Sequence, residues 1–245
     1  MNSFGITDPG KVRAENQDSF LIENCAKRNS VVAVICDGMG GAKAGDLASQ
    51  LSVKAFVSKV FDTILNSRMR FPAYEKLLRQ SCDAANGVVY EYSRFDADYN
   101  GMGTTLVGGI ITAHRAHIVN VGDSRCYHIN RKGIKQVTRD HSYVQELVDS
   151  GAISEAEAKI HPKRNIITRA LGVDKRIQSD YFDVSVKRGD AILLCSDGLS
   201  NTVTDAEMFS AYKAGKSPEK VCRSLIDLAL ERGARDNVSV VLVKI

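Results

Sequence analysis

Aspartates at the ends of strongly apolar segments are the residues of this chain best suited to chemistry. Asp37 follows the run Val31–Cys36 and precedes three glycines within four residues. Asp197 ends a second apolar run, and Asp236 stands close before a third. Runs so rich in Val, Ile and Leu are typical of strands buried on both faces. A carboxylate that a rigid strand delivers into a loop with little side-chain cover suits a hard cation and an anionic ligand.

Two further aspartates fit this pattern. Asp18 precedes the apolar stretch Ser19–Ile22, and Asp123 follows the expected strand Ala116–Val121 in a Gly-Asp-Ser turn. A single Asp-Gly pair is usually just a turn, but five acids at strand ends are harder to explain in that way. Clustered carboxylates without a cation repel each other and raise their own pKa values. The simplest interpretation is a bound divalent metal.

The strand directions decide whether these acids meet. If the strand after Asp236 runs antiparallel to the strands before Asp37 and Asp197, the three carboxylates lie at one edge of one sheet. We therefore expect a single sheet to carry all three.

The composition is that of an ordinary globular protein. The chain has 245 residues, of which 44% are hydrophobic and 25% are charged, and this length favours one large domain. The net charge of +4 is small, and no run of five Lys or Arg occurs, so nucleic-acid binding is not expected. The hypothesis is one domain over residues 1–245 that binds no nucleic acid.

Cysteine usage and the start of the chain bear on the compartment. The six cysteines form no C-x-x-C pair and no zinc spacing, which suits a reducing environment. The chain starts without a basic and apolar leader, and no apolar run is long enough to span a bilayer. We expect a soluble cytoplasmic protein without a membrane span.

The elements that must position the acids follow from apolar periodicity. A stripe at helical spacing predicts a long helix from about Ala44 to Ser67, and a second amphipathic helix follows Pro72. From Thr104 onward the pattern changes to short β-rich segments separated by turn residues, which predicts an antiparallel meander. Its expected strands are Thr104–Thr112, Ala116–Val121, Arg125–Asn130 and Ile134–Thr138.

The segment Asp140–Leu171 interrupts this series of strands. It is polar, contains His141 and His161, and carries a capping box at Ser154 that predicts a helix start. Insertions of this kind near a site often form a movable rim, so the segment is expected to be a small flap.

The order of the elements predicts the fold class. Two helices come first, then a long antiparallel run, then two helices that begin at Thr204 and Ser217-Pro218, then a last strand. This order is α+β and lacks βαβ alternation. Strands that are apolar on both faces need cover on both faces. We expect a four-layer α-β-β-α sandwich in which each of two antiparallel sheets is covered by helices.

Other phosphate-binding and nucleophile motifs are excluded. In the segment Gly40–Gly45 the residue after the last glycine is Asp46, where a nucleotide-binding loop requires Lys. The segment Gly101–Thr105 lacks the third glycine of a dinucleotide fingerprint and precedes a strand. No Gly-x-Ser-x-Gly sequence occurs.

Several short motifs occur in the order and spacing of one known family. They are Val12–Asp18, Cys36–Gly41, Gly103–Thr105, Val121–Arg125, Ser196–Gly198 and Arg235–Ser239. Together with His161–Asn165 and Thr168–Gly172, they resemble the metal-dependent (type 2C) protein serine/threonine phosphatases, specifically the compact bacterial branch. The resemblance runs from about Phe4 to Val243. It implies a β-sandwich flanked by helices, two Mn²⁺ or Mg²⁺ ions, and hydrolysis of phosphoserine and phosphothreonine in proteins.

The resemblance also implies roles for the acids. Asp37 would bridge both metals, and the carbonyl of Gly38 would bind one of them. Asp197 and Asp236 would complete the other, and Asp18 would hold coordinated waters. Ligation by oxygen alone favours Mg²⁺ or Mn²⁺ over Zn²⁺.

Arg13 resembles the phosphate clamp of the family, because a planar guanidinium can bind two phosphate oxygens. A solvated loop arginine is the alternative. Two metals about 3.5–4 Å apart can acidify a shared water for in-line attack on phosphorus. Arg13 would therefore hold the phosphate that this water attacks.

The chain departs from the pattern of animal members at two positions. Met39 stands where those members have a histidine that acts as leaving-group acid, and Gln17 stands where they have Glu. The acid that protonates the leaving serine oxygen is therefore unassigned, with a metal-bound water or His161 as candidates. For His141 and His161, the alternative is an exposed polar loop histidine.

A third, weaker metal is expected between Asp123 and a free oxygen of Asp197. Adjacent acids are costly unless a cation lies between them. A Gly-Asp-Ser turn needs no ion, which is the alternative for Asp123.

The resemblance further implies phosphorylated proteins as substrates and a cognate serine/threonine kinase. Two other classes stay open. One is a regulator that binds phosphoproteins without turnover, against which the intact set of acids argues. The other is a phosphatase dedicated to a single sporulation or stress antagonist, whose members usually carry a sensor domain.

Overall fold

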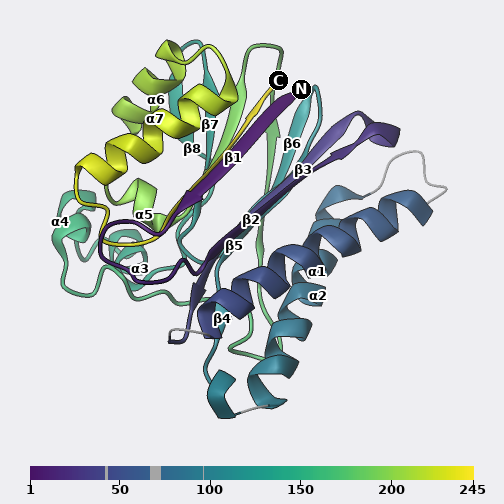
Figure 1. Cartoon of the computed structure of the whole chain (residues 1–245), viewed down its shortest axis with the longest axis vertical. Helices are drawn as coiled ribbons and strands as arrows, with labels where there is room; N and C mark the ends of the chain where they lie inside the picture. The colour runs from purple at the N-terminus through teal and green to yellow at the C-terminus, as the bar shows by residue number, and fades with distance from the viewer. Residues whose placement is uncertain (42–43, 67–72, 96) are drawn as a thin grey trace.

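The computed structural model describes residues 1–41, 44–66, 73–95 and 97–245. Two antiparallel sheets are stacked face to face, with helices on the outer face of each (Figure 1). Helices α1 (Ala44–Asn66) and α2 (Tyr74–Phe95) cover one sheet, and α6 (Asp205–Ala214) and α7 (Pro218–Glu231) cover the other. The predicted four-layer α+β sandwich is confirmed.

The first sheet joins the two ends of the chain. Its five strands lie in the order β1-β11-β10-β7-β8. Their bounds are Asn2–Asp8 for β1, Val238–Lys244 for β11, Ala191–Cys195 for β10, Arg125–Asn130 for β7 and Gly133–Gln136 for β8. Strand β11 pairs antiparallel with both β1 and β10, so the two termini lie side by side (Figure 1).

The second sheet has six strands, in the order β2-β3-β5-β6-β9, with β4 also paired to β3. Their bounds are Asp18–Cys25 for β2, Ser30–Met39 for β3, Gly103–Thr104 for β4, Leu106–Ile111 for β5, Arg115–Val121 for β6 and Asp180–Ser185 for β9. Two short 3-10 helices, η1 (Ala26–Arg28) and η2 (Ala97–Tyr99), lie in the connections before β3 and β4.

Two expectations about strand pairing are wrong. The predicted meander is split, because the hairpin β5–β6 lies in the second sheet and the hairpin β7–β8 lies in the first. Residues 122–124 therefore cross between sheets. Likewise β3, which ends in the Asp37 segment, and β10 with β11 lie in different sheets, so no single sheet carries Asp37, Asp197 and Asp236.

The apolar strands are buried on both faces because each sheet contributes to two cores. In β3, Val32, Val34 and Cys36 pack under α1 and α2, and the alternate residues Val31, Ala33 and Ile35 face the other sheet. In β11, Val240 and Leu242 pack under α6 and α7 while Val241 and Val243 face inward. The strand period of two thus distributes one apolar run between two layers.

The helix starts follow the predicted caps. Capping boxes are present at Ser154, before α4 (Glu155–Ile160), and at Thr204, before α6. Ser142 caps α3 (Tyr143–Asp149), and Ser217 caps α7, with Pro218 in its first turn. Ser67 and Pro72, at the expected end and start of the first two helices, lie outside the described residues. Within the described ranges, no helix is long and apolar enough to cross a membrane.

Candidate metal centre

Asp18 and Asp37 face each other at one end of the second sheet. They are partners in the register of β2 and β3. The Asp37 N–H donates to Thr105 Oγ1 at 3.0 Å, and its carbonyl accepts from Thr104 Oγ1 at 2.8 Å and from the Thr105 N–H at 2.9 Å. The backbone of Asp37 is therefore fixed on both sides.

Asp197 and Asp236 reach the same place from the first sheet. Asp197 opens the short helix α5 (Asp197–Ser200) directly after β10, and Asp236 lies two residues before β11. Because β10 and β11 are antiparallel, the end of one and the start of the other lie at the same edge. The charge of Asp197 contributes to the raised pKa of Asp37, so acids from the two sheets lie close together.

Burial and mutual repulsion oppose ionisation of this cluster. Burial, followed by the charge of Asp236, raises the pKa of Asp197 to about 6. Burial, followed by the charges of Asp18 and Asp197, raises the pKa of Asp37 well above its ordinary value. A cation between these carboxylates would reverse both effects.

Asp18 lies deeper than the other acids of the cluster. Its Oδ2 accepts from Ser196 Oγ at 2.7 Å, while its buried Oδ1 accepts no hydrogen bond from the described residues. Burial raises the pKa of Asp18 to about 7, and the charges of Asp197 and Asp236 add to this. Ser196 in turn accepts from the Ser239 N–H at 2.9 Å. Asp18 thus presents an oxygen with unused acceptor capacity.

Asp123 lies in the crossing between the sheets, near the same cluster. Burial and then the charges of Asp197 and Asp140 raise the pKa of Asp123 to about 8. Its neighbour Ser124 shares a hydrogen bond of 2.7 Å with Thr105, the residue that fixes Asp37. The crossing and the end of β3 are therefore linked.

The donor set fits hard divalent cations. It consists of carboxylates with raised pKa values, one orphaned buried oxygen and a nearby backbone carbonyl, and oxygen ligands of this kind select Mg²⁺ or Mn²⁺. In the part of the chain that the structure describes, no three Asp, Glu, His or Cys side chains form a group that could hold an ion. Any bound ion would therefore also need backbone oxygen and water ligands, as Mg²⁺ commonly does.

Gly38 has no room for a side chain. A Cβ atom there would lie 2.0 Å from the carbonyl oxygen of Gly45, at the start of α1. The Gly38 N–H donates to the Gln17 carbonyl at 3.1 Å. The Gln17 side chain donates from Nε2 to the Gly41 carbonyl at 2.7 Å.

Arg13 lies at the rim of the cluster. Its Nη2 donates to Asp236 Oδ2 at 2.9 Å, and its side chain is 56% exposed, which leaves it accessible to a ligand. The charges of Asp37 and Asp197 add to that of Asp236 in raising the pKa of Arg13. The guanidinium of Arg13 therefore lies beside the acidic cluster while remaining open to solvent.

Asn237 holds the loop that carries Arg13. Its Oδ1 accepts from the Gln17 N–H, and its Nδ2 donates to the carbonyls of Pro9 and Glu15, all at 2.9 Å. Asn237, Ser196 and Thr105 were not predicted to have roles, although all three lie within the short motifs that carry the family resemblance. Adjacency to Asp236 and Asp197 could have singled out Asn237 and Ser196, but Thr105 is adjacent to no acid.

The two flap histidines occupy different environments. His161 ends α4, and its Nδ1 accepts from the Lys163 N–H at 3.1 Å, so its ring contacts the flap itself. His141 is 5% exposed, and the alternative of an exposed loop histidine is wrong for it. Burial lowers the pKa of His141.

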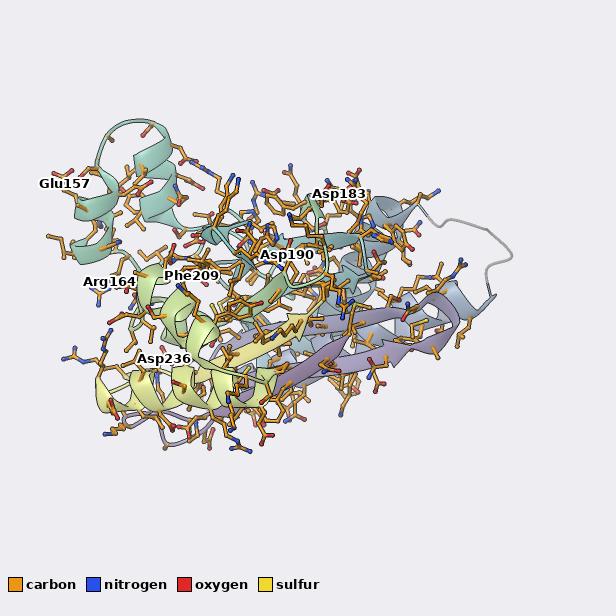
Figure 2. All side chains as sticks on the ribbon, turned by 90° about the horizontal axis from the view of Figure 1, so that it is seen from above. Glu157, Arg164, Asp183, Asp190, Phe209 and Asp236 are labelled. Atoms are coloured by element: carbon orange, nitrogen blue, oxygen red, sulfur yellow. The ribbon has the colours of Figure 1, made fainter. Side chains whose placement is uncertain are left out.

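The flap forms one wall of a cleft beside the acids. The cleft has a volume of about 560 Å³ and is lined by Asp123 and Asp197, by residues of α3 and α4, and by the segment from α5 to α6. Lys159 and Arg164 line it from the flap. Figure 2 shows the flap, with Glu157, at the same end of the molecule as Asp236. A substrate that enters this cleft reaches the acidic cluster.

Comparisons with known proteins show the class to which a chain with this fold belongs. The family model of protein phosphatase 2C matches residues 11–218. The serine/threonine phosphatase stp of Listeria welshimeri is 38% identical over 239 residues, which cover 97% of this chain and 93% of that protein.

Solved structures are similar over the whole chain. A bacterial serine phosphatase has a TM-score of 0.92 at 38% identity, with 100% of this chain and 98% of that chain covered. The catalytic domain of the serine/threonine protein phosphatase PstP, in complex with two manganese ions, has a TM-score of 0.85 at 32% identity, with 99% of this chain and 97% of that chain covered.

The chain belongs to the protein phosphatase 2C family of metal-dependent protein serine/threonine phosphatases, and the predicted resemblance to its bacterial branch is confirmed. It is thus an enzyme, a metal-dependent protein phosphatase. The assignment of individual site residues stays a prediction.

Proposed function

We propose that this enzyme hydrolyses phosphoserine and phosphothreonine in proteins with water activated at a centre of two Mn²⁺ or Mg²⁺ ions. The observation that carries the proposal is the meeting of Asp37 with Asp197 across two sheets, in a cluster whose pKa values are raised by burial and repulsion. Near neutral pH, carboxyl groups placed in this way can either keep a proton or ionise and bind a cation, and a bound cation removes their mutual repulsion.

The chain offers a ligand for each part of such a centre. Asp37 would lie between the two ions, and the Gly38 carbonyl would bind one of them. Asp197 and Asp236 would bind the other, and Asp18 would hold coordinated waters through its unpartnered Oδ1. When bound, the ions lower the pKa of water and neutralise charge on the phosphoryl oxygens.

Arg13 would hold the phosphate. Its guanidinium is already oriented by Asp236 and remains more than half exposed, so it can donate to phosphate oxygens. Met39 has no proton to give to the leaving serine oxygen. We propose a water in the cleft as the donor in preference to His161, whose ring lies against Tyr143 and the Lys163 N–H of its own segment.

A third, weaker ion would bind between Asp123 and Asp197. The charge of Asp197 is the largest electrostatic contribution to the raised pKa of Asp123. Only two carboxylates support this ion, so we expect it to bind at millimolar concentrations.

The proposal extends to the setting of the enzyme. Residues 1–245 would form one phosphatase domain, with residues 140–171 as its flap. The substrates would be phosphorylated proteins of the cytoplasm, and a bacterial serine/threonine kinase would supply them. Curated relatives carry the names of serine/threonine phosphatases, which supports the substrate class.

Metal-dependent dephosphorylation of a phosphopeptide panel tests the proposal, with Asp37→Asn as the blank. Turnover by the parent with Mn²⁺, but not with a chelator and not by Asp37→Asn, is the expected result. Binding of phosphopeptides without turnover would instead make the chain a phosphoprotein-binding regulator. Turnover of one phosphoprotein alone would indicate a dedicated phosphatase.

A further inference from the structure

His141 lies where the flap joins the crossing that carries Asp123. The Gly122 N–H donates to His141 Nδ1 at 3.1 Å, and the His141 N–H donates to the Gly122 carbonyl at 2.9 Å. Two reciprocal hydrogen bonds thus join the residue before Asp123 to the second residue of the flap.

Gly122 is a position that needs such support. Its φ is +105°, in the region that favours glycine, and a Cβ there would lie 2.6 Å from Thr105 Cγ2. Asn120 Nδ2 donates to the Gly122 carbonyl at 3.1 Å and to the Arg139 carbonyl at 3.2 Å. Asn120 and His141 therefore hold the same carbonyl, and the His141 side chain also accepts from the Gly122 N–H.

The second ring nitrogen of His141, Nε2, lies beside residues at the C-terminal end of the flap and in β9. His141 Nε2 lies 3.2 Å from Asp180 Oδ2, and Arg169 Nη1 lies 3.0 Å from Asp180 Oδ1. Arg169 Nη1 is also 3.2 Å from Nε2. Because Nδ1 accepts from Gly122, the ring proton resides on Nε2, and Asp180 accepts from both donors.

A backbone hydrogen bond also connects the two ends of the flap. The Thr168 N–H donates to the His141 carbonyl at 2.8 Å. Both ends of the flap therefore meet at His141, where Thr168 contacts the backbone carbonyl and Arg169 contacts the buried imidazole. A shift of the flap that moves His141 must also move the peptide before Asp123.

We infer that His141 is a positioning residue that fixes the Gly122–Asp123 turn and couples it to the flap. It touches neither substrate nor metal. Through the turn it sets where the Asp123 carboxylate lies, so the effect on metal binding rests on the third ion of the proposed function. The effect of His141 on the position of the turn does not depend on that ion.

Two variants separate the contact that Nδ1 makes with Gly122 from the contact that Nε2 makes with Asp180. His141→Asn keeps an acceptor near the position of Nδ1 and loses the contact with Asp180. His141→Gln places its amide near the position of Nε2 and loses the acceptor for Gly122. His128 is the matched control, because it lies in β7, outside the flap and the Gly122 turn, and its Nε2 pairs with Asp190 Oδ2 at 2.9 Å.

The first measurement uses the metal-free protein. ¹⁵N NMR of the imidazole should show His141 with Nδ1 unprotonated and Nε2 protonated. Hydrogen exchange of the Gly122 amide should be at least about tenfold faster in His141→Gln than in the parent or in His141→Asn. His128→Gln should leave this exchange unchanged.

The second measurement is Mn²⁺ titration by calorimetry with phosphopeptide kinetics. We expect His141→Gln to bind the weak ion about tenfold less tightly and to lose about tenfold in kcat, with the tight ions and KM unchanged. His141→Asn should restore most of both. Unchanged Gly122 exchange in His141→Gln, or equal losses in His128→Gln, would overturn the inference. If the parent protein binds no weak ion, the third metal site of the proposed function is wrong. The role of His141 is then decided by the Gly122 exchange rate and by kcat.

Discussion

At the scale of single residues, the carboxylates of the site lie where ionisation without a bound cation is energetically costly. Asp18 and Asp37 come from one sheet and Asp197 from the other, and burial is the largest cause of the raised pKa at each. Such sites bind cations because the ion removes both the repulsion and the cost of burying charge.

We expect Asp37 to be required for turnover but to destabilise the metal-free protein, and its replacement tests both effects. Asp37→Asn should abolish phosphopeptide turnover and raise the Tm of the metal-free protein, because the change removes a carboxyl group that burial and neighbouring charges make costly to ionise. Kinetics with Mn²⁺ and thermal unfolding in chelator measure the two effects. Asp227→Asn, on the exposed face of α7, is the control and should change neither. Turnover near that of the parent would contradict the role of Asp37.

Arg13 should act on substrate engagement. Arg13→Ala is expected to raise KM for phosphopeptides and to lower kcat/KM about 10- to 100-fold, the size of about 1.5–3 kcal/mol for a charged hydrogen bond. Arg13→Lys keeps the charge without the planar fork and should recover only part of the loss. Unchanged KM and kcat/KM in Arg13→Ala would make it an ordinary loop residue.

At the scale of elements, the end of β3 is packed against the start of α1. Gly38→Ala would place a methyl group against the Gly45 carbonyl, and the backbone that offers the proposed carbonyl ligand would have to shift. We expect a loss of about 1–3 kcal/mol in the free energy of unfolding and weaker binding of the tight ions. Denaturant unfolding and calorimetry measure them.

Gly133→Ala is the matched control for this substitution, because an added Cβ there meets no atom within 4 Å. It should leave both quantities unchanged. A Gly38→Ala protein with the stability and Mn²⁺ affinity of the parent would show that the close approach is not required.

The elements themselves were largely predictable, but their pairing was not. The alternation that sends Val32 and Val34 to one core and Ala33 and Ile35 to another makes β3 apolar throughout, which reveals burial on both faces but not the neighbouring strand. The three residues between β6 and β7 are short enough for a hairpin, so the crossing between sheets had no local signal.

The supporting residues of the site escaped prediction for a related reason. Ser196 bonds to Asp18 across 178 positions of sequence, and Asn237 bonds to Gln17 across 220. Contacts of this range depend on which sheets stack, which the periodicity does not encode. His141 was expected as a possible loop residue because its segment is polar, and only the tertiary contacts bury it.

At the scale of the whole molecule, the acids make the stability of the metal-free protein depend on pH. The pKa values of Asp197, Asp18 and Asp123 rise from 3.8 to about 6, 7 and 8. Because the folded pKa values lie above the unfolded ones, the contribution to stability is complete below about pH 4 and is lost as pH rises through 6 to 8.

Thermal unfolding in chelator should therefore show a lower Tm at pH 8.5 than at pH 5, by at least about 5 °C, since 1 kcal/mol shifts Tm by about 2–4 °C at this size. Saturating Mn²⁺ should raise Tm more at pH 8.5 than at pH 5, because the ions bind ionised carboxylates. Asp18→Asn should flatten the dependence in chelator. A metal-free Tm that rises from pH 5 to pH 8.5 would contradict the repulsive cluster.

The stacking of the two sheets is what brings the acids together, so the location of the ions is the most direct test of the account. Anomalous scattering from crystals of the enzyme grown with Mn²⁺ would locate them. The account predicts two strong peaks in contact with the Asp37 carboxylate, one also at the Gly38 carbonyl and the other at Asp197 and Asp236. Strong peaks elsewhere, with none at Asp37, would contradict it.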